Sequence, residues 1–96
     1  MALFVVQHKH AAETCPAQNK EMAPQLLAHL SKPNAEKFGV KILSEAVVNG
    51  AHTLYLTVEA ADEKAVRGYM QPFAQAGSVD VFLASRCEVV VDRGYC

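Results

Sequence analysis

The dipeptide Asn49-Gly50 constrains the fold of this chain more than any other feature of its sequence. Asparagine and glycine both tolerate positive φ, so this pair favours the tight turn of a β-hairpin. Two runs with strand character flank the turn, Val40 to Val48 and His52 to Glu59. The second run alternates apolar with more polar residues, which predicts one face toward a core and one more polar face. A central antiparallel hairpin is therefore expected.

Further strand and helix patterns lie on both sides of this hairpin. A strand is predicted over Leu3–His8, and a helix follows over Lys20–Leu30. The buried stripe of this helix is predicted from apolar residues at helical spacing: Met22, Leu26, Leu27 and Leu30. After the hairpin a second helix starts near Asp62, and Pro72 kinks or ends it. The last strand is predicted over Val79–Val91, with an interruption at Arg86.

The resulting order is β-α-β-β-α-β within one predicted domain, residues 1–96. This order in so short a chain indicates an α+β class and a ferredoxin-like sandwich. Such a sandwich has an antiparallel four-stranded sheet with two helices on one face. In this topology the first strand lies between the third and the fourth.

The charge, hydropathy and cysteine content of the chain predict which partners and which compartment it has. The net charge is −1 and no basic run occurs, so no nucleic-acid partner is predicted. No segment approaches the roughly 18 apolar residues of a membrane span, and the apolar start lacks a basic leader, so a cytoplasmic protein is predicted. The three cysteines form an odd set that does not resemble a secreted disulfide framework. In a reducing compartment they are free thiols, ligands or nucleophiles.

A His-x-His-x4-Cys cluster is the strongest functional signal. His8 and His10 are two residues apart at a strand end, so they point to one side, roughly 6.6 Å apart. Cys15 follows in a loop, where Pro16 holds it in extended backbone. Two imidazoles and a thiolate suit nickel, zinc, copper or iron(II).

The predicted topology adds a fourth donor. The third strand starts beside the end of the first, which brings His52 near His8. The predicted metal ligands are therefore His8, His10, Cys15 and His52, with Glu13 and Asp80 as carboxylates that can orient an imidazole. Cys87 and Cys96 are predicted to be remote from this cluster, and His29 is interpreted as structural.

The chain also resembles the dimeric α/β-barrel superfamily in element order and in the run Met70-x-Pro72-Phe73-x3-Gly77-x-Val79. That group holds small monooxygenases, stress-responsive barrel proteins and small nickel-binding domains. A homodimer is expected, since the sheet face without helices carries residues such as Val5, Tyr55 or Phe82, and three functions remain open. The first is a metal-binding protein. The second is a cofactor-independent enzyme of the monooxygenase or cyclase type, with His8 or His52 as acid/base and Tyr55 contacting a small-molecule ligand in an apolar cleft. A binding module without chemistry is the third alternative.

Overall fold

The computed structural model describes all 96 residues of the chain. The strands are β1 (Ala2–His10), β2 (Val40–Val48), β3 (Thr53–Ala60) and β4 (Gly77–Ala84). The α-helices are α1 (Met22–His29), α2 (Lys32–Lys37), α3 (Glu63–Tyr69), α4 (Gln71–Ala76) and α5 (Cys87–Arg93), and two 3-10 turns, η1 (Ala12–Thr14) and η2 (Pro16–Gln18), follow β1. None of the helices is both long and apolar enough to cross a membrane.

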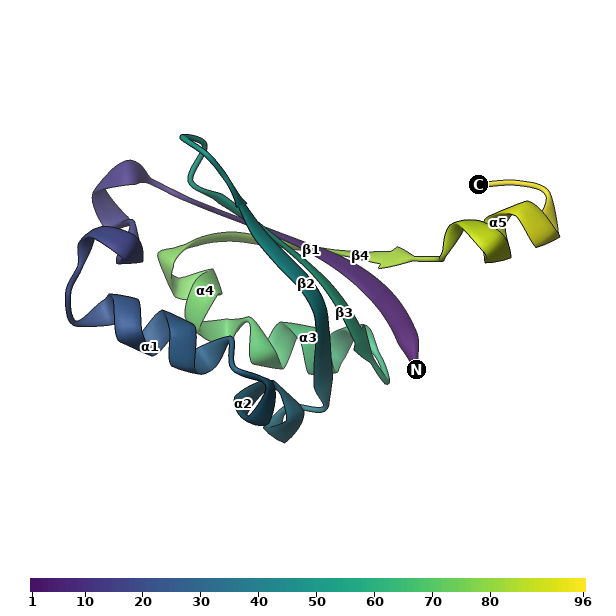
Figure 1. Cartoon of the computed structure of the whole chain (residues 1–96), viewed down its shortest axis with the longest axis horizontal. Coiled ribbons are helices and arrows are strands. Elements are labelled where there is room, and N and C mark those ends of the chain that lie inside the picture. Colours follow the sequence, from purple (N-terminus) through teal and green to yellow (C-terminus); the bar gives the residue numbers. More distant parts are fainter.

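The four strands form one antiparallel sheet in the order β2-β3-β1-β4. Helices α1 to α4 lie on one side of this sheet, and the other side is open (Figure 1). The predicted α+β class and the antiparallel four-stranded sheet are confirmed. The helix predicted over Lys20–Leu30 is present as α1, and the helix predicted from near Asp62 breaks at Pro72 into α3 and α4, as expected. Helix α2 is separate from α1, and Pro33 and Pro72 stand in the first turns of α2 and α4. Proline is favoured there because a first-turn N–H has no helical partner.

The core lies between the sheet and the helices. β1 and β3 each turn alternate residues toward it, such as Phe4 and Val6 from β1 and Leu56 from β3. From the helices, Tyr69 and Phe73 pack onto this apolar surface. The predicted alternation of β3 is therefore confirmed, and the hairpin ends in a turn where Gly50 has a φ of 76°.

The last strand is shorter than predicted. β4 ends at Ala84, and the run from Cys87 to Arg93 forms helix α5, which stands away from the rest of the molecule (Figure 1). The prediction of a strand up to Val91 is wrong because β4 pairs with β1, and Ala84 lies beside Leu3 at the start of β1. Beyond that point no neighbouring strand is available to complete a ladder, so valine-rich sequence alone does not make a strand.

Helix α1 also differs from the prediction. None of its residues is fully buried, and Leu27 is 72% exposed while Met22 is 45% exposed. Only Leu26 and Leu30 of the predicted stripe pack against the core. Helix α1 therefore covers the sheet loosely.

Candidate metal site

Two histidines face each other where β1 ends and β3 begins. The antiparallel register pairs Lys9 with Thr53. One residue further out, the backbone N–H of His10 donates a hydrogen bond to the carbonyl of His52 at 3.1 Å. The two imidazole rings lie edge to face, with centroids 5.2 Å apart. The predicted position of His52 at this end of the sheet is confirmed.

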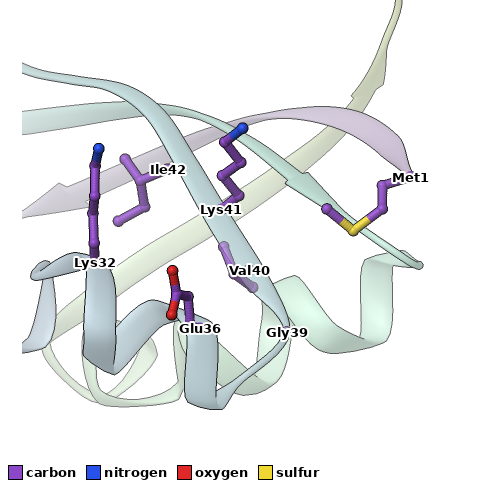
Figure 2. A pocket seen from close by; sticks show the side chains of 7 residues that line it. All are labelled: Met1, Lys32, Glu36, Gly39, Val40, Lys41 and Ile42. Atoms are coloured by element: carbon purple, nitrogen blue, oxygen red, sulfur yellow. The ribbon is translucent and has the colours of Figure 1, made fainter.

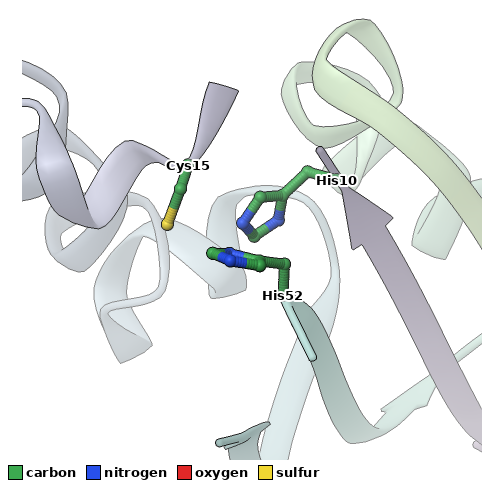
Figure 3. A group of neighbouring side chains, drawn as sticks. All are labelled: His10, Cys15 and His52. Atoms are coloured by element: carbon green, nitrogen blue, oxygen red, sulfur yellow. The ribbon is translucent and has the colours of Figure 1, made fainter. Parts of the chain in front are cut away.

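Cys15 reaches the same place from the loop after β1. The residue has extended backbone, φ −64° and ψ 116°, as predicted from the proline that follows it. Its side chain points back toward the two rings (Figure 3). One ligating atom each from His10, Cys15 and His52 lies within 4.8 Å of the others. This group could hold a metal ion, since two imidazole nitrogens and a thiolate are a common donor set for transition metals.

The imidazole of His10 is the least satisfied polar group in the chain. Both of its ring nitrogens are buried, and neither has a hydrogen-bond partner. A buried polar group without a partner costs about 1–3 kcal/mol. Burial lowers the pKa of His10, and the neighbouring rings of His8 and His52 lower it further. The ring is therefore held in the neutral form, which is the form that binds metal.

His52 has an unusual backbone. It is the only non-glycine residue with positive φ, at 48°. Left-handed backbone is uncommon for residues with a side chain, although histidine adopts it more readily than most. Such conformations concentrate at functional sites, where surrounding structure holds them. This conformation lies at the end of the hairpin turn and carries the ring that faces His10.

His8 occupies a different environment from the three grouped donors. It is buried, and its Nδ1–H donates to the carbonyl of Ser78 at 2.9 Å. This bond leaves Nε2 without a proton in the neutral ring. Burial lowers the pKa of His8, and the bond to Ser78 partly opposes that shift. The ring of His8 lies beside that of His10, tilted by 30° with centroids 5.4 Å apart, but His8 is outside the three-residue group.

The contact of His8 with Ser78 depends on the glycine beside it. A Cβ on Gly77 would lie 1.9 Å from the carbonyl oxygen of Lys9, so only glycine permits this approach of β4 to β1. The prediction from sequence did not include Ser78, because every residue has a backbone carbonyl and the residue type does not indicate which one accepts a hydrogen bond. Gly77 before the last strand was the available signal, since glycine in a strand indicates close backbone approach.

The remaining predicted residues lie apart from the group. Asp80 pairs with Gln7 on the sheet face opposite to His8, so it cannot orient these rings. Cys87 and Cys96 are exposed thiols at and beyond α5. Because β4 ends beside the start of β1, both lie away from His10, as predicted. His29 contacts Tyr69 and Asn34 instead, which agrees with its structural interpretation.

A hollow of about 350 Å³ adjoins the three donors, and we call it the α1 chamber. Its walls include His10, Cys15 and His52 together with apolar side chains from α1, the hairpin and α4. These apolar residues include Leu26, Leu27, Leu30, Val47, Leu54 and Phe73. A second hollow of about 420 Å³ shares the wall residues His8, Pro16, Leu26 and Phe73 with it. Both exist because α1 covers the sheet without burying any of its own residues.

A separate hollow lies between α2 and β2. Lys32 and Glu36 of α2 face Lys41 and Ile42 of β2 across it (Figure 2). Its volume is about 380 Å³, similar to that of the α1 chamber. It contains no histidine or cysteine, so it lacks the donors that distinguish the α1 chamber.

Comparisons with protein-family models, with curated proteins and with solved structures found no match to this chain.

Proposed function

We propose that this chain binds a transition-metal ion through His10, Cys15 and His52. The observation that carries the proposal is the imidazole of His10, whose two buried nitrogens have no partner although a thiol and a second imidazole lie within 4.8 Å. A bound ion would satisfy one of these nitrogens. The three donors come from two strand ends and one loop, which the antiparallel register holds together.

The donor chemistry favours nickel, zinc, copper or iron(II). Two imidazoles and a thiolate are of intermediate softness, unlike the oxygen-only sites of magnesium and calcium. Affinity for such a site rises from iron(II) through nickel to copper(II) and falls again at zinc. A thiolate ligand must stay reduced, which favours the cytoplasm as the compartment of the protein.

Metal retention tests the proposal. Protein purified without a histidine tag is loaded with zinc, nickel, copper(II) or iron(II), passed over a desalting column, and analysed for metal. The expected result is one ion per chain for at least one of the four metals. Retention of none of the four ions would refute the proposal.

The three free cysteines supply matched variants for this experiment. Cys15→Ser is expected to remove stoichiometric metal, because a hydroxyl is a far poorer ligand than a thiolate. Cys87→Ser and Cys96→Ser make the same chemical change at exposed sites on the other end of β4, and they are expected to bind metal like the parent. Loss of metal in Cys96→Ser would place the tail in the site, reached from a partner subunit.

We assign His8, which we also predicted as a ligand, a positioning role in this site. Its ring is fixed by the Ser78 carbonyl and by an edge contact with Phe73, at 5.2 Å between centroids. It packs beside His10 and limits how that ring can turn. Residues that orient metal ligands in this way typically change metal affinity about 10–100-fold when they are replaced.

We further propose a ferredoxin-like arrangement and a homodimer. The strand order β2-β3-β1-β4 supports the first, together with helices on one sheet face. The open sheet face supports the second, since Tyr55 is 39% and Phe82 is 53% exposed there, and an apolar surface of this kind favours association. Sedimentation at micromolar concentration is expected to show a dimer. A single 10.4 kDa species would contradict it.

The α1 chamber favours a second candidate function, a cofactor-independent enzyme. Its apolar walls also contain His8 and His52, which could move a proton to or from a bound molecule. Under this candidate the parent protein retains no metal in the desalting experiment. A small molecule that co-purifies with metal-free protein, seen by native mass spectrometry, would support it.

A further inference from the structure

We propose that the α1 chamber binds a small molecule with an apolar body and one anionic donor group, carboxylate or thiolate, which completes the coordination of the metal. This inference rests on the proposed metal site. It adds the class of ligand that the site takes.

The three protein donors do not fill the coordination shell of a transition-metal ion. Three protein ligands gather at the site, whereas zinc and similar ions bind four or more. Three-ligand sites leave a position for water or an external ligand. Glu45 is the only carboxylate in the chamber wall and its side chain is exposed at the edge, so it does not join the group.

The charge of the bound ion favours an anionic ligand. A divalent ion with two neutral imidazoles and one thiolate carries a net charge of +1. The chamber wall contains no lysine or arginine, and the ion would therefore be its only strong positive charge. A single anionic group placed on the ion neutralises this charge, which favours an anion over a neutral donor in a low-dielectric site.

The size and lining of the α1 chamber suit the apolar body of a ligand. Its volume of about 350 Å³ falls within the range of small-molecule sites, and its walls beyond the donors are mostly aliphatic. The hollow is partly open to solvent, so a small molecule can reach it. It lies beneath α1, the helix that buries none of its residues. The body of the ligand would replace the missing packing of this helix.

The probes for the test are propionate, butyrate, pentanoate and hexanoate, titrated into cobalt(II)-loaded protein. The visible absorption of cobalt(II) reports a change in its ligands. Each added methylene is expected to lower the dissociation constant roughly fourfold, which corresponds to burial of one CH₂. The metal-free protein is expected to bind the same acids at least tenfold more weakly.

Two variants locate the binding of the apolar body. Leu26→Phe adds a ring inside the chamber and is expected to remove the dependence on chain length while cobalt is retained. Val47→Phe makes a similar change from an exposed wall position, 58% accessible, where folding is not at risk. Leu83→Phe is the matched control, because Leu83 is 74% exposed and lies outside the chamber. It is expected to behave like the parent.

The outcomes separate the two proposals. If cobalt is retained but the acids bind equally at all lengths, or leave the absorption unchanged, the ligand inference is wrong and the metal site stands. If the acids bind metal-free protein as well as the loaded protein, coordination to the metal is wrong. If no metal is retained, the proposed function fails, and the ligand inference fails with it.

Discussion

His29 and His10 illustrate how the same residue type serves two purposes in one small domain. The Nε2–H of His29 donates to the carbonyl of Tyr69 at 2.7 Å, and its Nδ1 accepts from the side chain of Asn34 at 3.1 Å. Its ring also stacks on that of Tyr69, 4.6 Å between centroids. The ring of His10 is similarly surrounded by protein, yet neither of its nitrogens has a partner.

The difference teaches where to look for function among buried polar groups. A satisfied histidine stabilises the fold, and its hydrogen bonds fix its tautomer. An unsatisfied histidine lowers stability, so its presence is informative when other metal-binding side chains converge on it. In this chain Tyr69 reinforces the first case, since burial raises its pKa to about 12 and its hydroxyl donates to the carbonyl of His29.

The largest expected effect is on metal affinity at His10. His10→Ala removes one of three ligands, and we expect metal affinity to fall by at least about 100-fold, because even outer-shell changes typically cost about 10–100-fold. The same change removes an unsatisfied group, so the metal-free protein should lose little stability. A competition titration against a chromophoric chelator measures the affinity. Unchanged metal affinity in His10→Ala would show that His10, like His29, is not a metal ligand.

The converse effect is expected at His29. His29→Ala leaves the Tyr69 carbonyl without its imidazole donor, removes one of the two hydrogen bonds of the Asn34 amide, and removes the stacked ring. We expect the free energy of unfolding to fall by roughly 2–3 kcal/mol, measured by urea denaturation. Metal affinity of the folded protein should equal that of the parent. A variant that folds as stably as the parent would show that this network does not stabilise the domain.

A smaller effect is expected at His52, where two variants distinguish the role of the left-handed backbone in stability from the role of the imidazole in metal binding. His52→Asn keeps a residue that tolerates positive φ, so the unfolding free energy should stay within about 0.5 kcal/mol while metal affinity falls. His52→Val removes the same imidazole but places a β-branched residue in left-handed backbone, which should cost roughly 1–2 kcal/mol. Equal stability of the two variants would show that the turn does not hold this conformation.

The smallest effect is the pH dependence of the metal-free protein. The pKa values of His8 and His10 are lowered by folding, so the unfolded chain takes up protons first as the pH falls. Stability should therefore be greatest above about pH 6.5 and decline below it, until the pKa values of the folded state are reached. Urea midpoints between about pH 7.5 and 5.5 measure this decline. His10→Ala should make the decline of stability with falling pH shallower. Equal slopes in the variant and the parent would show that folding does not lower the pKa of His10.

The sequence was sufficient to predict the hairpin and the position of His52 at the candidate metal site. Asn49-Gly50 placed β2 and β3 side by side, and the antiparallel topology then placed His52 at the end of β1. The extended backbone of Cys15 followed from its proline neighbour. These predictions rest on local backbone preferences and on strand alternation, which can be recognised from residue types and their order alone.

The parts that could not be predicted depend on contacts between distant segments. His8 and His10 look equivalent in the sequence, and only the register of β4 shows that the Ser78 carbonyl occupies one nitrogen of His8. The valines of α5 have strand propensity, but no strand lies beside them to form a ladder. The leucines of α1 have helical spacing, and yet the helix lies above a hollow rather than against a filled core.

X-ray absorption at the zinc edge of the zinc-loaded protein tests the central claim most directly. The account predicts one sulfur at about 2.3 Å and at least two imidazole nitrogens at about 2.0–2.1 Å around each zinc ion. Cys15→Ser should remove the sulfur signal, whereas Cys87→Ser should retain it. A first shell without sulfur, or one with oxygen ligands alone, would contradict binding by His10, Cys15 and His52.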